Sequence, residues 1–193
     1  MLETVRRLGG NAANVHDWFD LVAETRSLTS PQDKLRRVNE FFNHRIAFAD
    51  DLVVWGQTDY WATPAETLAM GRGDCEDFAI AKYFTLLNTG IANEQLRLVY
   101  VKARIGGATS TLLQAHMVLA YYPAPDADPL VLDNLITEIR PANRRPDLAP
   151  VFSFNSQGIW PGASGGDPRG SGGIGRLSRW QDLLLRARRE GFD

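Results

Sequence analysis

The chain has 193 residues, of which 44% are hydrophobic and 23% charged, enough for one globular domain with a substantial core. Its net charge of −2 provides no basic field for nucleic acid or an anionic membrane, and no apolar run is long enough to span a bilayer. The single cysteine excludes an internal disulfide and, beside only three histidines, argues against a thiolate–imidazole zinc site. We therefore predict a single domain over residues 1–193.

Two long helices are predicted near the N-terminus. Residues 14–28 carry apolar side chains at the three-and-four spacing of an amphipathic helix, at Val15, Trp18, Phe19, Val22 and Ala23. Residues 30–46 open with helix start signals, because Ser30 can cap a helix and Pro31 suits its first position. The buried face of this second helix is expected to contain Leu35, Val38, Phe41 and Phe42.

A short helix and a longer helix are predicted around the only cysteine. Thr63, Pro64 and Glu66 have the pattern of a capping box, and Gly71 is expected to end that short helix. The next helix is expected to begin at Asp74–Cys75 and to run to about residue 88. Its sequence is densely apolar, so we expect it to lie at the centre of the fold.

The second half of the chain predicts an antiparallel sheet. Residues 96–105, 112–122 and 129–135 are rich in β-branched and aromatic side chains, and the turn-like sequence PAPDADP joins the last two. The glycine-rich residues 161–175 are expected to form a mobile loop. Residues 177–190 are expected to form a closing helix, with four inward side chains at Leu177, Trp180, Leu183 and Leu184. Helices followed by an antiparallel sheet predict the α+β class.

Cys75 has several features of a nucleophile. A thiol at the start of a helix lies near the positive end of the helix dipole, which lowers its pKa. Gly71 and Gly73 are expected to allow a tight turn and to leave the sulfur uncrowded. Neighbouring acids act in the opposite direction, because negative charge disfavours a thiolate; they are Asp74, Glu76 and Asp77. The competing interpretation is a small core cysteine.

A base and an orienting carboxylate are available downstream. His116 is expected on a strand face with Val118 and Ala120, against which the helix of Cys75 would pack. Asp133 lies in the next predicted strand, and the turn can bring it beside His116. Together they fit a cysteine nucleophile, its base and the group that orients the base. Taken singly, a buried histidine is commonly a core residue, and an aspartate after a strand commonly caps a turn.

These motifs resemble those of the bacterial transglutaminase-like cysteine proteinases. The resemblance rests on DYWATPAETLAMGRGDCEDFAIAKY, QAHMVLAYY and LVLDNL, which are specific as a set. It implies a papain-like, transglutaminase-like fold, in which an N-terminal helical lobe packs on an antiparallel sheet with the active site in the cleft between them. By position, it implies that Cys75 is the nucleophile, His116 the base and Asp133 the orienting residue.

The resemblance also implies calcium (Ca2+) as a cofactor. Acidic ligands flank the catalytic cysteine in this family, and the matching positions here are Asp74 and Glu76, with Asp77 as a less certain third ligand. Calcium prefers several oxygen ligands, and a bound cation would offset the charge that opposes the thiolate. The alternative is that these acids only favour a helix N-terminus. The acids at Asp50–Asp51 are interpreted as solvated loop residues.

An oxyanion hole is expected to include the backbone N–H of Cys75, since developing negative charge needs fixed donors. A second donor is expected from the segment before the capping box. Gln57, Tyr60 and Trp61 carry suitable groups there, and Trp61 is favoured.

The implied function is a thiol endopeptidase that cuts the N-terminal region of a large cell-surface adhesin, at a paired-alanine site. Adhesin release would promote biofilm dispersal, and an inner-membrane cyclic-di-GMP receptor would sequester the protease. The implied compartment is the periplasm, in tension with an N-terminal sequence that lacks the apolar core of a signal peptide. Two alternatives remain: a transglutaminase-type acyltransferase with the same triad, and a non-catalytic calcium-dependent binding module.

Overall fold

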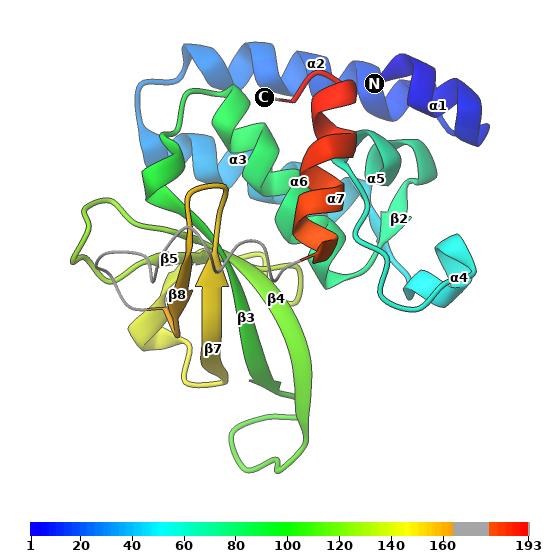
Figure 1. Cartoon of the computed structure of the whole chain (residues 1–193). Coiled ribbons are helices and arrows are strands. Elements are labelled where there is room, and N and C mark those ends of the chain that lie inside the picture. Colours follow the sequence, from blue (N-terminus) through cyan, green and yellow to red (C-terminus); the bar gives the residue numbers. More distant parts are fainter. Residues whose placement is uncertain (164–177, 193) are drawn as a thin grey trace.

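The computed structural model describes residues 1–163 and 178–192. Figure 1 shows a group of helices lying against one end of an antiparallel sheet, whose long strands extend beyond them. The described helices are α1 Leu2–Leu8, α2 Ala12–Ser27, α3 Pro31–Arg45, α4 Asp51–Trp55, α5 Pro64–Met70, α6 Cys75–Asn88 and α7 Ser178–Arg189. The predicted α+β class is confirmed.

The main sheet has the strand order β6-β5-β4-β3-β7-β8, and all its neighbouring strands are antiparallel. Its strands are β3 Leu96–Arg104, β4 Leu113–Tyr121, β5 Leu130–Leu132, β6 Arg140–Pro141, β7 Leu148–Phe154 and β8 Ile159–Pro161. The predicted hairpin through PAPDADP is present, because β4 pairs with β5 in a register that joins Leu119 to Leu132.

Capping residues begin α3 and begin and end α5 where the sequence predicts, whereas α2 begins at Ala12, two residues before the predicted start, and α1 and α4 were not predicted. The hydroxyl of Ser30 accepts the N–H of Asp33 at the start of α3. Thr63 and Glu66 exchange hydrogen bonds in a complete capping box at the start of α5. Gly71 follows α5 in the left-handed conformation, with φ of 64°, which glycine adopts without steric cost.

Helix α6 lies at the centre of the molecule, as predicted. Its residues from Asp77 to Leu86 are all buried, and it packs against β4, α3 and α5. On α2 the apolar stripe is shifted from the expected one, because Leu21 is buried while Phe19 is 47% exposed. On α3, Leu35 and Val38 are buried, whereas Phe41 is half-buried.

The two faces of the main sheet carry separate apolar clusters. Met117 and Leu119 of β4 pack in the main core with α6, whereas Val118 and Ala120 belong to a second cluster on the alternate face. We expected α6 to pack on the face that His116 shares with Val118. That expectation is wrong, because alternation along β4 directs the odd-numbered side chains to the helix.

Strand β5 is shorter than predicted, because it ends at Leu132 and leaves Asp133 outside the sheet. Two amides of α3 bind the backbone of the segment that follows. Asn43 donates to the carbonyl of Asp133, and Asn39 donates to the carbonyl of Thr137. These bonds hold the segment against the helical side of the fold.

A two-stranded parallel pairing, which the sequence does not signal, joins β1 Ala47–Phe48 to β2 Arg72–Gly73. Gly73 has a packing role here. A Cβ added at Gly73 would lie 2.5 Å from Asp77 Oδ2, so the missing side chain makes room for a carboxylate, not for the sulfur as we expected.

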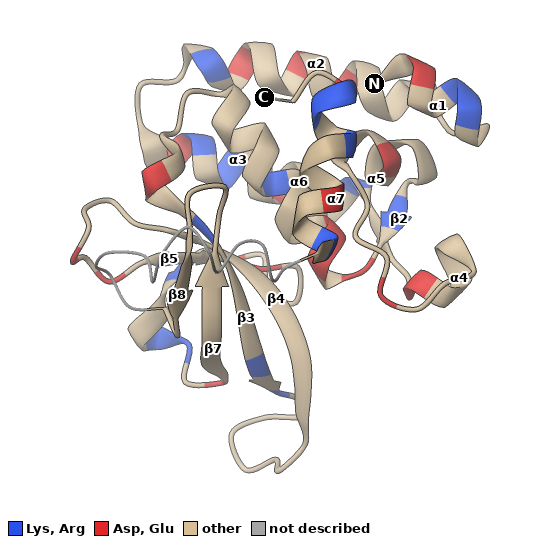
Figure 2. Ribbon diagram, in the orientation of Figure 1, with Lys and Arg blue, Asp and Glu red and all other residues tan. Residues whose placement is uncertain are grey.

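The closing helix α7 is confirmed over Ser178–Arg189. Trp180 and Leu183 are buried and Leu184 packs against the core. Leu177 and most of the predicted glycine-rich loop lie outside the described residues. Figure 2 shows that charged residues are spread along the helices and are sparse on the long strands. Within residues 1–163 and 178–192, no helix has the length and apolar character needed to cross a membrane.

Replacement of Trp180 by alanine should destabilise the protein strongly. The side chain is 0% exposed and contacts the rings of Tyr83, Phe84 and Phe154. We expect Trp180→Ala to lower the free energy of unfolding by about 3–5 kcal/mol, measured by denaturant titration. The control is Leu185→Ala on the same helix, whose side chain is 57% exposed and should change stability by about 0.5 kcal/mol or less. Equal losses would contradict this assignment of the core.

Candidate active site

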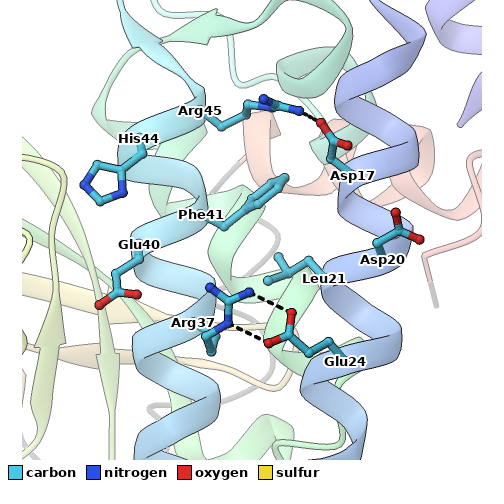
Figure 3. A pocket seen from close by; sticks show the side chains of 9 residues that line it. All are labelled: Asp17, Asp20, Leu21, Glu24, Arg37, Glu40, Phe41, His44 and Arg45. Carbon is cyan, nitrogen blue, oxygen red and sulfur yellow. Dashed lines mark hydrogen bonds and ion pairs between the residues drawn. The ribbon is translucent and has the colours of Figure 1, made fainter.

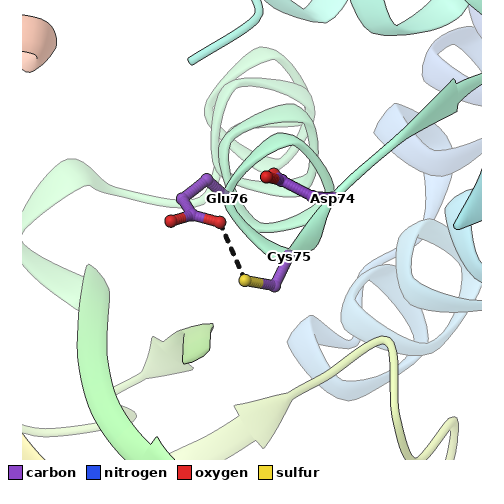
Figure 4. Close-up of side chains that lie close together, drawn as sticks. All are labelled: Asp74, Cys75 and Glu76. Carbon is purple, nitrogen blue, oxygen red and sulfur yellow. Dashed lines mark hydrogen bonds between the residues drawn. The ribbon is translucent and has the colours of Figure 1, made fainter. Parts of the chain in front are cut away.

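Cys75 is the first residue of α6, where the backbone N–H groups of a helix have no partner within the helix. Figure 4 shows its side chain beside Asp74 and Glu76. The thiol donates a hydrogen bond to Glu76 Oε2 across 2.8 Å. One predicted oxyanion donor, the N–H of Cys75, therefore lies where an α-helix offers free donors.

The surroundings of Cys75 hold its thiol in the protonated form. Burial raises the pKa of the thiol, and the charge and hydrogen bond of Glu76 raise it further, followed by the charge of Asp74. The backbone N–H of Met117 acts in the opposite direction and lowers the pKa. Because Met117 belongs to β4 and follows His116 in the sequence, this interaction places the sulfur near β4.

His116 and Asp133 lie in direct contact, as predicted. His116 Nε2 is 2.8 Å from Asp133 Oδ1, and both side chains are buried. The Asp133 oxygen also accepts the backbone N–H of Leu135 at 3.0 Å. The other two histidines, His16 and His44, are exposed.

Asp133 is held as an anion. Burial alone would raise its pKa, but hydrogen bonds and charge from His116, the N–H of Leu135 and Arg145 outweigh burial and lower the pKa to about 2. An ionised carboxylate only accepts hydrogen bonds. Nε2 of His116 therefore carries the proton in this contact, and Nδ1 is the nitrogen available to another partner.

The early end of β5 exposes the edge of β4 at this position. The register that joins Leu119 to Leu132 would join His116 to Leu135, but β5 ends before that point. His116 therefore lies at an open edge of the sheet. Within the described residues no hydrogen bond joins Cys75 to His116, and the thiol's partner is Glu76.

Three carboxylates gather behind Cys75. Asp51, Asp74 and Asp77 each offer an oxygen within 4.8 Å of the others. One oxygen of each, Asp51 Oδ1, Asp74 Oδ1 and Asp77 Oδ2, is buried and has no hydrogen-bond partner in the described part of the chain. None of the ion pairs formed by residues 1–163 and 178–192 involves these three acids.

Such a cluster suits a hard cation. Burial first, and then the charges of neighbouring acids, raise the pKa of Asp74 to about 9, and burial raises the pKa values of Asp51 and Asp77 as well. Unpartnered carboxylate oxygens that resist ionisation in a small volume are what Ca2+ can satisfy, because it takes six to eight oxygen ligands. The residues therefore fit the implied calcium ion.

The arrangement of the acids differs from the predicted ligand set. Asp74 belongs to the carboxylate cluster and also lies beside Glu76 and Cys75. Asp77, the least certain of the predicted ligands, is in the cluster. The sequence interpretation missed Asp51, which is buried and not a solvated loop acid. No local signal separates Asp51 from the exposed Asp50, since only the packing of α4 against β2 turns one inward.

The segment before α5 closes one side of this cluster. The backbone N–H of Tyr60 donates to Asp51 Oδ2, and that of Ala62 donates to Asp77 Oδ1. From the other side, Arg186 of α7 donates to the carbonyl of Trp61 at 2.7 Å. Two distant parts of the chain therefore hold the same short segment.

The candidate second oxyanion donors lie on this segment, and two of them are already engaged. The indole N–H of Trp61 donates to Asp59 at 3.0 Å, and the hydroxyl of Tyr60 donates to Glu66. Gln57 is exposed. The preference for Trp61 stays a prediction, and its N–H would have to leave Asp59 to serve an oxyanion.

A separate groove of about 500 Å3 lies between α2 and α3 and is shown in Figure 3. Ion pairs bridge it, from Arg37 to Glu24 and from Arg45 to Asp17. It contains none of the predicted catalytic or metal-binding residues. The chemistry therefore belongs at the start of α6.

Comparison with known proteins identifies relatives of the chain. The family model described as bacterial transglutaminase-like cysteine proteinase matches residues 18–147. The chain is 38% identical to a calcium-bound Legionella pneumophila LapG, with a TM-score of 0.79 over 95% of this chain and 97% of that chain. An EGTA-treated Legionella pneumophila LapG is 39% identical, with a TM-score of 0.76 over 91% and 88% of the two chains. No curated protein sequence matches the chain.

Asp51 should contribute to calcium binding, whereas its neighbour Asp50 should not. Asp51 is buried in the carboxylate cluster and Asp50 is exposed. We expect Asp51→Asn to weaken calcium binding about 10- to 100-fold, because one charged oxygen ligand is lost. Asp50→Asn is the matched control and should bind calcium like the unaltered protein. Isothermal titration calorimetry checks both, and equal affinities would exclude Asp51 as a ligand.

The carboxylate cluster should make the calcium-free protein lose stability as the pH rises. A carboxyl group with a raised pKa holds its proton in the folded state after the unfolded chain has released it. The free energy of unfolding therefore falls as the pH rises from the pKa of the unfolded chain to the pKa of the folded protein. For Asp74 these values are 3.8 and about 9. Burial lowers the pKa of Lys82 to about 7, which has the opposite effect at higher pH, so the test belongs at about pH 4.5–6.5.

We therefore expect the Tm in EGTA to decrease across this interval. Calcium should flatten the decrease, because a bound cation takes the place of the protons. Differential scanning calorimetry with and without calcium measures both slopes. Asp74→Asn in EGTA should also show a smaller slope. A Tm in EGTA that rises with pH over this range would contradict the assignment.

Proposed function

The chain belongs to the bacterial transglutaminase-like cysteine proteinases, and from that membership we propose that it is a calcium-dependent endopeptidase whose nucleophile is Cys75. The observation that carries the proposal is the contact of His116 Nε2 with the anionic Asp133, beside the strand edge that the thiol approaches. This is the pairing that a base needs in order to present its other nitrogen to a nucleophile.

In the proposed reaction, the thiol of Cys75 leaves its acceptor Glu76 and gives its proton to Nδ1 of His116. The sulfur attacks a peptide carbonyl, and the backbone N–H of Cys75 stabilises the oxyanion. The C–N bond breaks as His116 returns the proton to the leaving amine. Water then gives a proton to His116 and attacks the thioester carbonyl. The C–S bond breaks, the new C-terminal acid leaves, and His116 returns the proton to the sulfur of Cys75. Asp133 holds the ring throughout and stays ionised.

Calcium is the proposed cofactor, held by Asp51, Asp74 and Asp77, with Glu76 as a further ligand. The buried oxygens without hydrogen-bond partners support these ligands, and the calcium-bound and EGTA-treated LapG structures support calcium as the ion. When bound, the ion would supply positive charge beside Cys75 and so offset the acids that raise the pKa of the thiol. The residues themselves fix the turn that presents the sulfur, since Ala62 and Tyr60 donate to Asp77 and Asp51.

We propose the N-terminal region of a large cell-surface adhesin as the substrate, cut at a paired-alanine site. Cleavage would release the adhesin and promote biofilm dispersal. An inner-membrane cyclic-di-GMP receptor would sequester the protease in the periplasm. These points rest on the family resemblance, and likeness to LapG over almost the whole of both chains supports them.

Two alternatives use the same residues or the same fold. A transglutaminase-type acyltransferase would pass the acyl group to an amine in place of water, and incorporation of a labelled primary amine without hydrolysis would favour it. A non-catalytic calcium-dependent binding module would release the adhesin equally well with Cys75→Ala. The buried pair of His116 and Asp133 favours catalysis.

The proposed activity has a direct test. An adhesin N-terminal fragment incubated with the protein and calcium should be cut at one site, which mass spectrometry of the products locates. Cys75→Ala and His116→Ala should each lower kcat/KM by about 1,000-fold or more, because members of a triad act as a unit. EGTA should abolish the cut.

The matched control for the base is His16→Ala, since His16 is exposed on α2 and should leave the rate unchanged. Full cleavage by Cys75→Ala would refute the proposed nucleophile. Cleavage unaffected by exhaustive chelation would refute the calcium requirement while leaving the peptidase assignment in place.

A further inference from the structure

Arg145 contacts Asp133 on the oxygen that His116 does not use. Arg145 Nη2 lies 2.7 Å from Asp133 Oδ2, while His116 Nε2 lies 2.8 Å from Oδ1. The side chain of Arg145 is 1% exposed and that of Asp133 is fully buried. We propose that Arg145 is a positioning residue, which fixes the orientation of Asp133 and, through it, the imidazole of His116. This inference rests on the proposed function.

Arg145 is itself held in place by a second carboxylate. Its Nε lies 3.0 Å from Asp147 Oδ1 and its Nη2 lies 2.7 Å from Asp147 Oδ2, a two-point contact between planar groups. Its backbone N–H donates to the carbonyl of Ala142 at the end of a short 3-10 turn. The guanidinium is therefore anchored before β7, and a continuous chain of contacts runs from His116 through Asp133 and Arg145 to Asp147.

The two oxygens of Asp133 depend on different donors. Oδ1 accepts from His116 and from the backbone N–H of Leu135, whereas within the described residues Oδ2 accepts only from Arg145. Loss of Arg145 would leave a buried anionic oxygen without a donor, which is costly. Asp133 would then rotate or take up a proton, and in either case it would no longer fix which nitrogen of His116 is protonated.

The surroundings of Arg145 strengthen this dependence. Arg145 borders a cavity of about 100 Å3 whose other lining residues are apolar, so few polar groups nearby could replace it. The titratable and charged groups that face Asp133 are His116 of β4, Lys82 of α6, and Arg145 before β7, with Asp147 behind Arg145. Lys82 is 1% exposed and attracts Asp133 by charge, but in the described structure it donates no hydrogen bond to it. Of the two cationic side chains near Asp133, Lys82 and Arg145, only Arg145 also donates a hydrogen bond that fixes the orientation of the carboxylate.

The test compares Arg145→Gln with Arg144→Gln, because Arg144 is the exposed neighbour of Arg145. The first readout is the tautomer of His116 in the calcium-loaded full chain, from 15N NMR with the three histidines labelled. Wild type and Arg144→Gln should carry the proton on Nε2. Arg145→Gln should show exchange between the two tautomers, and Arg145→Lys should restore the Nε2 tautomer in part, because lysine keeps the charge without the planar fork.

The second readout is the rate at which iodoacetamide alkylates Cys75 at one pH, which is unambiguous because the chain has one cysteine. Arg145→Gln should lower this rate about 10- to 100-fold, and Arg144→Gln should stay within about twofold of wild type. A folded Arg145→Gln that keeps both the Nε2 tautomer and the control rate would overturn the proposal.

A variant that keeps Arg145 in place covers the case in which Arg145→Gln fails to fold. Asp147→Asn loosens the guanidinium and should shift both readouts in the same direction by a smaller amount. If Asp147→Asn and Arg145→Lys both match the control, the proposal is also overturned. Neither readout requires a peptide to be cut. A protein without peptidase activity would thus refute the proposed function while leaving the positioning role of Arg145 measurable.

Discussion

The packing of α6 along β4 is the contact on which the rest of the site depends. It joins a helix that is buried from Asp77 to Leu86 to the central part of the sheet, and it sets the first residue of that helix against the edge of β4. A helix buried over this length is not easily displaced, because protein interiors are close-packed. Cys75 is therefore positioned by a closely packed, buried helix, although it lies at the end of that helix.

The proposed site combines two buried ionic groups of different character. On one side, His116 and Arg145 each contact one oxygen of the Asp133 carboxylate, so this buried anion has a side-chain partner on both oxygens. On the other side, the acids grouped around Asp74 carry one sign of charge and leave oxygens without donors. The first group supplies its buried anion with partners as folded, whereas the second needs protons or a cation. The site is thus built so that only one of its halves responds to the ionic composition of its surroundings.

Local sequence predicted the parts of the site that depend on neighbouring residues. The capping box of Thr63 and Glu66, the helix start at Cys75 and the hairpin that brings Asp133 to His116 all follow from short-range patterns. Contacts between distant segments could not be read in this way. Asp51 and Asp50 are chemically identical, as are Arg145 and Arg144, and only the folded chain buries one of each pair. The face of β4 that receives α6 was likewise assigned wrongly, because alternation gives two faces without saying which one is covered.

The contacts of Arg186 bear on the order in which the site is completed during synthesis. Arg186 binds the carbonyl of Trp61 and the carboxylate of Glu66, which precede it by 125 and 120 residues. A chain that grows from its N-terminus contains Cys75, His116 and every acid of the cluster well before it contains this arginine. The segment in which Tyr60 and Ala62 donate hydrogen bonds to those acids is therefore the last part of the site to gain all its contacts. A nascent or C-terminally trimmed chain can contain all the reactive residues and still lack the contacts of Arg186 that hold this segment in place.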